Sequence, residues 1–412
     1  MTSSRDQPGP LDTQSIGWPP HSDGCGPDDL PEEAYAAALA SIPYLRPPEV
    51  ARRLSGQSPS AAWAELLEGR RLRPGSAAGD LWSMVPPPTR EETDAPALTA
   101  RARIARSIEV AEVWARHREA GVKVVLPGGP GYPSALADDP FPPAVLFALG
   151  DLGALDARPR VGIIGTRRCT HYGREVARSL GRRLSAAGVV VVSGLALGID
   201  GAAHLGVLDG EGAPPVAVVG SGLDRPYPSR HSGLWERVAG RGLLLSEAAC
   251  GGIPATWRFP FRNRVIAGLS DVLVVVESHD RGGSLHTVDA AVERGRTVLV
   301  VPGPVSSAAS AGTNRLLYDG CGPVRDADDV LVALGLNPAA RDGGAGGGDP
   351  RIRPDPADAP ALAAVGWTAT STDRVVVRTG WSVARVTLAL ARLEDAGWIR
   401  ATGGWWERCA SW

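Results

Sequence analysis

The chain has 412 residues, a formal net charge of −2 and 21% charged residues, values that fit a globular protein of two or three domains. No apolar stretch approaches the roughly 18 residues that a membrane helix needs, and "MTSSRDQPGP" at the N-terminus has no basic region followed by an apolar run, so we expect no secretory signal. The five cysteines are scattered without a C-x-x-C pair, which argues against a zinc site or a disulfide framework. We therefore expect a cytoplasmic protein with no metal, no cofactor and no membrane partner.

Charge is distributed unevenly along this nearly neutral chain. The first 40 residues hold seven acids and one arginine, whereas the segment from Arg158 to Arg183 holds eight arginines and a single acid, Glu175. A concentrated basic segment indicates a local surface for anions, even though the total charge is close to zero.

The N-terminal part divides into two segments of different composition. Residues 1–30 are rich in Pro, Gly, Ser and Asp, which predicts a disordered arm. Residues 31–122 carry apolar side chains every three to four positions, as in "EEAYAAALASI" and "AAWAELLEGRRL". This spacing predicts a small helical domain.

Six short apolar runs alternate with helix-length stretches within residues 123–335. They are Val161–Ile164, Val189–Val192, Val216–Val219, Leu243–Leu245, Val272–Val276 and Val298–Val301. Runs this apolar suit strands that are buried on both faces of a parallel sheet. The alternation predicts an α/β fold with a doubly wound, mostly parallel sheet, in which ligands bind at the loops after the strands.

The C-terminal part is predicted to be a linker followed by a third domain. Residues 336–363 are rich in Gly, Pro and Asp and lack apolar periodicity, as in a linker. Residues 364–412 give a short helix, a turn at Gly380, a longer helix and a hairpin at Gly403 and Gly404. This order is typical of a winged-helix domain.

Glycine-rich loops follow the expected strands, and several of them carry arginine. "GTRRCTHYG" follows the first strand, "SGLALGID" the second, and "GSGLDRPYP", with Gly222, the third. "FPFRNRVIAG", just before the fifth strand, sets Arg262 and Arg264 either side of Asn263 at what we take to be a strand entrance. If these loops converge, their backbone N–H groups and guanidinium groups form a groove for phosphates.

The loops lack the motifs of nucleotide-hydrolysing or dinucleotide-binding enzymes. No G-K-[ST] Walker loop occurs, and "GIIGTRRC" is not G-x-G-x-x-G. Asp200 and His204 lie four positions apart, a spacing that would suit acid–base chemistry or half a metal site. We favour the alternative, a helix-capping aspartate beside a hydrogen-bonded histidine, because no third ligand is close in sequence.

The ordered motifs "GTRRCTHYG", "VVSGLALGIDGAAH", "FPFRNRVIAGLSDVLVVVES" and "GTNRLLYDG" resemble the DNA-processing protein A family, also called DprA or Smf. The resemblance covers roughly Lys123 to Leu334. It implies an extended Rossmann-like fold, with a helical SAM-like domain before it and a winged helix after it. It also implies a homodimer without enzymatic activity that binds single-stranded DNA, protects incoming strands in natural transformation and assists loading of a RecA-type recombinase.

The resemblance carries over a set of DNA-binding residues, motif by motif. They are Gly165, Thr166, Arg167, Ser193, Gly194, Phe259, Arg262, Asn263 and Arg264. A second set lies in the same group of loops: Ala196, Gly198, Gly222, Ser284 and Thr287. Phe259 would stack on a base while the arginines hold phosphates. The loop of Ser284 departs from the family pattern, with Gly282 where serine is usual and Val288 where alanine is usual.

Two other functions compete with this one. A nucleoside monophosphate phosphoribohydrolase also uses glycine-rich loops on this kind of fold, and Glu293 in "RGGSLHTVDAAVE" is the best acid, although at the wrong spacing. A transcriptional regulator would read DNA through its winged helix. The second helix there carries only Arg385 and Arg392, and Trp405 and Trp406 in the wing favour protein docking.

Overall fold

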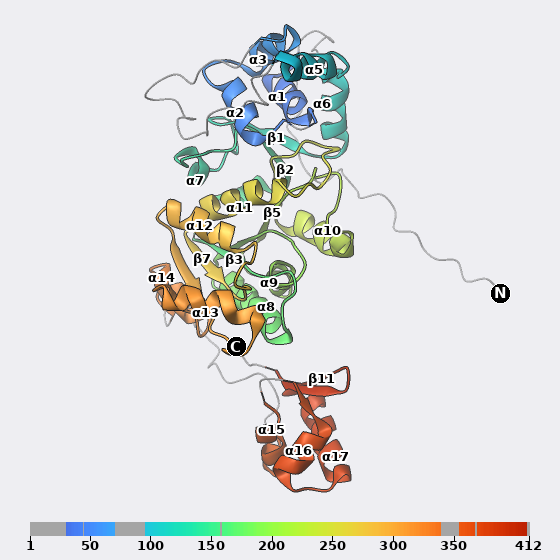
Figure 1. The fold of residues 1–412 in the computed structure, drawn as a ribbon, viewed down its shortest axis with the longest axis vertical. Helices are drawn as coiled ribbons and strands as arrows, with labels where there is room; N and C mark the ends of the chain where they lie inside the picture. The colour runs from blue at the N-terminus through green and yellow to red at the C-terminus, as the bar shows by residue number, and fades with distance from the viewer. Residues whose placement is uncertain are drawn as a thin grey trace, which may run out of the picture.

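The computed structural model describes residues 30–43, 45–70, 95–156, 159–338, 354–366 and 369–409. The arm predicted for residues 1–30 lies, apart from its last residue, outside these ranges. Three units follow one another along the long axis: a group of helices, a central sheet covered by helices, and a small C-terminal unit (Figure 1). Within the described ranges, every helix is too short or too polar to cross a bilayer.

The first unit is helical. Its described helices are α1 (Glu32–Ser41), α2 (Pro47–Leu54), α3 (Pro59–Leu67), α5 (Ala95–Arg106) and α6 (Val110–Glu119). Prolines stand at the first position of α2 and α3, where a helix has no use for the missing N–H. The alanine-rich α1 packs against α3 and α6, so that Ala36, Ala37 and Leu39 are fully buried.

A nine-stranded sheet forms the centre of the described chain, in the order β1-β2-β6-β5-β4-β3-β7-β8-β9. The strands are β1 (Lys123–Val125), β2 (Leu146–Gly150), β3 (Arg160–Ile164), β4 (Val190–Ser193), β5 (Pro215–Val219), β6 (Leu243–Ser246), β7 (Val272–Val275), β8 (Thr297–Val300) and β9 (Gly322–Pro323). All neighbours from β6 to β9 pair in parallel, and β1 and β2 are antiparallel. The predicted α/β class is confirmed, and the six predicted strands agree with the observed ones to within one residue at each end.

Helices cover both faces of the sheet. They are α7 (Ser134–Ala137), α8 (His171–Ala186), α9 (Ile199–Leu208), α10 (Ser232–Arg241), α11 (Arg258–Leu269), α12 (Leu285–Glu293), α13 (Ala311–Tyr318) and α14 (Ala327–Ala333), with short 3₁₀ turns at η2 (Leu152–Leu155), η3 (Ser229–His231) and η4 (Ala308–Ser310). Side chains alternate along each strand, so Ile163 packs in the core on the side of α8 and α9. Its neighbour Ile164 packs in the core that contains α11 and α12.

The strand order reverses direction between β3 and β7. From β3 the chain adds β4, β5 and β6 on one side, and β7, β8 and β9 then extend the sheet on the other side. In a doubly wound sheet such a switch point opens a crevice beyond the carboxyl ends of the strands. The segments that leave β3 and β7 therefore mark the place where a ligand is expected.

The C-terminal unit has its own core. Its elements are η6 (Pro356–Asp358), α15 (Ala359–Ala364), β10 (Thr370–Ser371), α16 (Thr372–Thr379), α17 (Val383–Asp395), β11 (Ile399–Thr402) and β12 (Trp405–Arg408). Val386, Leu390 and Leu393 are buried, and Gly380 ends α16 at a φ of 68°. The predicted winged helix is confirmed. Helix α15 packs into its core, so the packed unit includes part of the predicted linker, whose residues 339–353 lie outside the description.

Candidate nucleic-acid interface

The stretch "FPFRNRVIAG" is helical rather than a loop at a strand entrance. It forms most of α11, the crossover helix between β6 and β7. Phe259, Arg262, Asn263 and Ile266 recur at the three-to-four spacing of one helix face, and this face lines a groove of about 480 Å³ at the switch point. The other walls of the groove are the segments that follow β3, β4 and β7.

This cationic groove brings together nine of the predicted binding residues. They are Gly165, Thr166, Arg167, Ala196, Phe259, Arg262, Asn263, Ser284 and Thr287. Five others are not among the residues that line it: Ser193, Gly194, Gly198, Gly222 and Arg264. Contact with DNA remains a prediction for every member of both sets.

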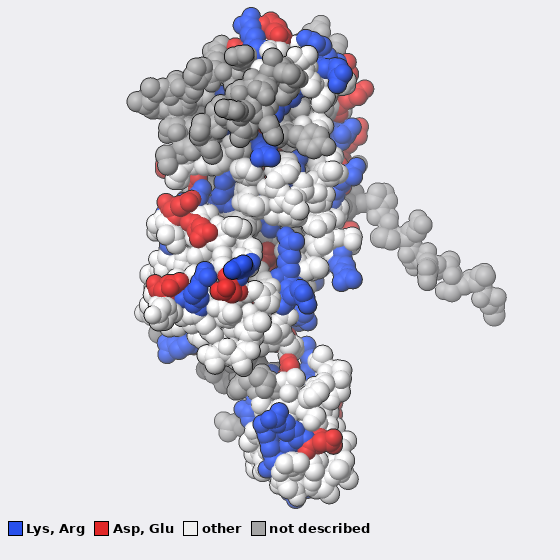
Figure 2. All heavy atoms as spheres, viewed as in Figure 1, with Lys and Arg blue, Asp and Glu red and all other residues white. Residues whose placement is uncertain are grey.

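The charge of the groove is strongly positive. It is lined by Arg167, Arg168, Arg262 and Arg281, and by one carboxylate, that of Asp200. Burial raises the pKa of Asp200, while the nearby guanidinium of Arg262 acts in the opposite direction. In Figure 2, basic side chains over the middle of the central unit lie interspersed with acidic ones. The groove therefore suits a chain of phosphates better than a single carboxylate ligand.

The guanidinium of Arg167 lies over the ring of Phe259. The guanidinium carbon of Arg167 lies 4.7 Å from the ring centroid, and Tyr227 lies beside the ring at a centroid distance of 6.0 Å. Gly220 leaves room for this cluster, since a Cβ there would lie 3.3 Å from a ring carbon of Phe259. A nucleobase entering the groove thus meets a layered surface of arginine and aromatic ring.

The turn after β3 is held closely against β7. The Thr166 N–H donates to the carbonyl oxygen of Glu277 at 2.8 Å. A side chain at Gly165 would place its Cβ 2.5 Å from Ile199 and 2.8 Å from the same carbonyl oxygen, so only glycine fits. This close approach presents Arg167 to the groove.

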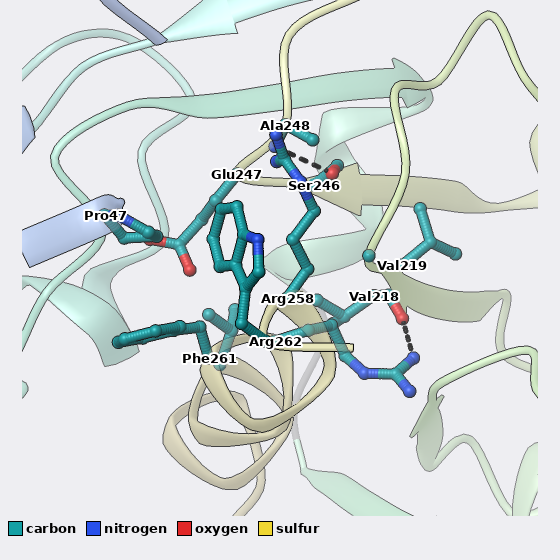
Figure 3. A pocket seen from close by; sticks show the side chains of 12 residues that line it. Pro47, Val218, Val219, Ser246, Glu247, Ala248, Arg258, Phe261 and Arg262 are labelled. Atoms are coloured by element: carbon teal, nitrogen blue, oxygen red, sulfur yellow. Dashed lines mark hydrogen bonds between the residues drawn. The ribbon is translucent and has the colours of Figure 1, made fainter. Parts of the chain in front are cut away.

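Arg262 is almost fully buried and makes several internal hydrogen bonds. Its Nη1 donates to the carbonyl oxygens of Gly194 and Val218, both at 2.6 Å, and its Nε donates to the Asn263 side chain at 3.0 Å. Figure 3 shows this guanidinium turned toward Val218, while Arg258 leaves the same helix in another direction. Burial lowers the pKa of Arg262 to about 10, although Asp200 opposes this shift. The side chain stays charged at neutral pH.

Arg264 belongs to the opposite side of α11. Its guanidinium lies over the Phe141 ring at 4.0 Å and donates to Glu247 and to the Phe141 carbonyl oxygen. Burial raises the pKa of Glu247, and the charge of Arg264 opposes that rise. These contacts give Arg264 an internal role, and nothing in its position supports the predicted contact with DNA.

Three other predicted residues make contacts with backbone groups of neighbouring segments. The Ser193 hydroxyl donates to the Ile163 carbonyl oxygen at 2.6 Å, linking β4 to β3. Gly198 has a φ of 84°, and a Cβ there would lie 2.4 Å from the Thr166 carbonyl oxygen. Gly222 lies against the loop after β6, with its N–H donating to the Gly252 carbonyl oxygen at 2.8 Å.

The loop after β7 leaves no room for a side chain at Gly282, one of its two departures from the family pattern. The Ser284 hydroxyl donates to Ser278 Oγ at 2.9 Å, and a Cβ at Gly282 would lie 2.6 Å from that oxygen. Thr287 is buried beside it. The same loop and the start of α12 add groove-lining residues that the motifs missed, namely His279 and Arg281 in the loop and His286 in the helix. Their signal is present in the sequence, because "SHDRGGSLH" places two histidines and an arginine in the stretch that follows a strand.

Asp200 is not the N-cap of α9. The helix begins at Ile199 after Gly198, and the Asp200 carboxylate accepts the Gly194 N–H at 3.2 Å from within the first turn. His204 is fully buried, and burial together with neighbouring His231 lowers its pKa to about 3. Within the described ranges, His, Cys, Asp and Glu form no group of three that could hold a metal.

The fold and the groove define a class: doubly wound α/β proteins with an arginine-lined crevice at the switch point and a C-terminal winged helix. A family model described as DNA recombination-mediator protein A matches residues 123–335, and a DprA winged helix domain model matches residues 349–404. The chain belongs to the DNA recombination-mediator protein A (DprA) family.

Curated and solved relatives agree with this assignment. The putative DNA processing protein DprA of Mycobacterium tuberculosis (strain ATCC 25618 / H37Rv) is 41% identical over 267 residues, 64% of this chain and 68% of that protein. The DNA processing protein DprA of Bacillus subtilis (strain 168) is 37% identical over 222 residues, 54% and 74% of the two chains. The X-ray structure of DprA from Streptococcus pneumoniae superposes with a TM-score of 0.57 at 27% identity, covering 74% of this chain and 98% of that one.

Proposed function

We propose that this chain binds single-stranded DNA in the cationic groove and acts in DNA processing during natural transformation. The observation that carries the proposal is the groove itself, which is lined by four arginines and one carboxylate; that carboxylate, of Asp200, already accepts the Gly194 N–H and lies close to the charge of Arg262. Relatives named as DNA processing proteins support it.

The exposed arginines Arg167, Arg168 and Arg281 supply the phosphate contacts. Bases stack on the layer formed by Arg167 and Phe259, which accepts every base because each has a π-face. A duplex hides its bases inside the helix, so a single strand gains this stacking and a duplex does not. Binding is therefore selective for single strands and indifferent to sequence.

Two partners complete the proposal. The bound strand passes to a RecA-type recombinase, in keeping with the description of the family as a recombination mediator. The chain works as a homodimer, as the family resemblance implies. Light scattering at several concentrations measures the assembly, and a recombinase filament assay on single-stranded DNA measures the transfer. A monomer at all concentrations, or a filament that forms no faster with the protein, would remove that part of the proposal.

Fluorescence anisotropy with a labelled oligothymidine tests strand binding. The variant Arg167→Ala/Arg168→Ala/Arg281→Ala should bind more weakly and reduce the slope of log affinity against log salt by about 0.7 for each lost contact. Arg182→Ala removes an exposed arginine of α8 that is not among the residues lining the groove, and it should bind like the wild type. Equal affinity and slope in all three proteins would remove the groove from DNA binding.

We propose no catalytic step in this groove. Glu293, the acid of the competing phosphoribohydrolase, lies at the end of α12 with 75% of its side chain exposed and is not among the residues that line the groove. Release of free base from nucleoside monophosphates would contradict this proposal, and chromatography of the incubated mixture detects it.

The winged helix is proposed to dock a protein rather than to read a DNA sequence. Arg392 donates to the buried carboxylate of Asp358, and Arg385 lies over the Trp381 ring at 3.8 Å. Both arginines of α17 are thus engaged within their own domain. Exposed Val383 and Leu388 give the outer face of α17 an apolar character.

A further inference from the structure

The turn between β4 and α9 is strained. Leu195 has a φ of 55°, the only positive φ among the described residues other than glycine, and its side chain is fully buried. A non-glycine residue in this region is disfavoured and persists only where its surroundings impose it. Contacts on both sides of Leu195 must therefore hold the turn.

Gly194, just before Leu195, is held at both of its backbone groups. Its N–H donates to the Asp200 carboxylate at 3.2 Å, and its carbonyl oxygen accepts from Arg262 Nη1 at 2.6 Å. A Cβ at Gly194 would lie 2.2 Å from that nitrogen and 2.6 Å from the carboxylate oxygen, so the two side chains fill the space completely. The carbonyl oxygen of Leu195 is also held, by His231 Nδ1 at 3.0 Å.

The far end of the same turn, at Gly198, sets the position of the loop after β3, which contains Thr166 and Arg167. Gly198 packs directly on the backbone of Thr166 and Arg167, where a Cβ would lie 2.4 Å and 2.9 Å from their carbonyl oxygens. Ala196, between the two glycines, lines the groove. A shift of the turn at Gly194 would thus move Arg167, whose guanidinium covers Phe259.

We infer that Arg262 and Asp200 form a positioning pair, which holds the strained turn and through it Arg167, and that Arg262 is not itself a phosphate ligand. The inference rests on the proposed binding of single-stranded DNA. It divides the arginines of the groove into two kinds: the buried Arg262 shapes the wall, and the exposed arginines contact the strand.

Asp200→Ala separates this role from simple electrostatics. Removing a negative charge from a cationic groove should tighten DNA binding if charge alone matters. The positioning role requires the opposite, an affinity about tenfold weaker, the size of one lost hydrogen bond to a charged group. Asp200→Asn keeps an acceptor oxygen for the Gly194 N–H without the charge, and its affinity should be close to that of the wild type.

Amide hydrogen exchange of the DNA-free protein supplies the second readout. Exchange at residues 194–198 should rise in Asp200→Ala and Arg262→Ala and stay at the wild-type rate in Arg167→Ala. Unchanged exchange in the first two variants, or tighter binding by either Asp200 variant, would overturn the positioning role while the wild type still binds DNA. Should either alanine variant fail to fold, Asp200→Asn decides by its affinity. Failure of the wild type to bind any oligothymidine would instead overturn the proposed function.

Discussion

The carboxylate of Glu277, at the end of β7, holds the N-terminus of α8 through Thr170. One carboxylate oxygen accepts the Thr170 hydroxyl at 2.6 Å and the other accepts its N–H at 2.9 Å. In many doubly wound proteins this position receives the phosphate of a nucleotide, because a helix N-terminus attracts anions. Here the carboxylate of Glu277 already occupies this position, so the N-terminus of α8 is not free to bind the phosphate of a mononucleotide.

Glu277→Gln should destabilise the protein without creating a nucleotide site. The glutamate is buried, and hydrogen bonds to a buried charged group contribute about 1.5–3 kcal/mol each. Urea unfolding measures the loss in the free energy of unfolding. Glu293→Gln, which changes an exposed carboxylate, should lie within about 0.5 kcal/mol of the wild type. A rise in melting temperature of wild-type protein with ATP or NAD would contradict this account.

Phe259→Ala should weaken oligothymidine binding by about 1–3 kcal/mol, the contribution of one stacked base. The slope of affinity against salt should stay as in the wild type, since the phenyl ring contacts no phosphate. Trp405→Ala, on an exposed aromatic of the winged helix, is the matched control and should leave affinity unchanged. If Phe259→Ala bound oligothymidine as tightly as the wild type, stacking of a base on Phe259 would be excluded.

Arg264→Met should lower stability and leave the salt slope of DNA binding unchanged. Removing one partner of a buried pair with Glu247 costs about 3–5 kcal/mol, because the remaining carboxylate loses its counter-charge. Urea unfolding and salt titration of the same sample give both quantities. A normal stability with a reduced slope would restore Arg264 to the DNA-binding residues.

His204 should make the protein less stable below pH 6.5. Its pKa is about 3 in the folded state, so the unfolded chain takes up a proton near pH 6.5 that the folded chain refuses. The unfolding free energy should therefore fall by up to about 1.4 kcal/mol per pH unit from this group as pH decreases from 6.5. His204→Leu should reduce that fall between pH 7.5 and 5.5, and the exposed His286→Leu should not. Parallel curves for wild type and His204→Leu would contradict the shift.

Deleting residues 354–412, the whole packed C-terminal unit, should leave oligothymidine binding within about threefold of the wild type, because the groove is built entirely from residues 164–287. The change is expected to be small because the winged helix has a separate core. Anisotropy on the shortened chain measures it. Loss of binding would place the DNA site, or part of it, on the winged helix.

The central strands could be predicted from sequence because each is a short, continuous apolar run. The strands that sequence analysis missed lack this signal: β1 has three residues, β9 has two and ends in a proline, and "LFALG" of β2 contains no β-branched residue. β1 and β9 are the two edge strands and β2 lies next to β1; these strands form through pairing with distant partners, such as Phe147 of β2 with Ser246 of β6. Local patterns carry no information about such pairing.

The site was only partly predictable, for a reason that Arg262 and Arg264 illustrate. Residues two positions apart point the same way on an extended chain and roughly opposite ways on a helix. An extended "FPFRNRVIAG" places both arginines in the groove, whereas the helix that forms there directs Arg264 to Glu247. The contact of Thr170 with Glu277 joins segments 107 positions apart, beyond any motif.

The parallel pairing of β3 with β7 constrains how the molecule is made. Val161 of β3 pairs with Val272 of β7, which is 111 positions later in the sequence. The groove residue His286 follows β7 and is synthesised later again. During translation, β3 emerges from the ribosome long before its second neighbour, so the nascent chain exposes basic side chains without a formed groove. The groove can therefore be complete only after Thr287, the last of its lining residues in sequence, has left the ribosome.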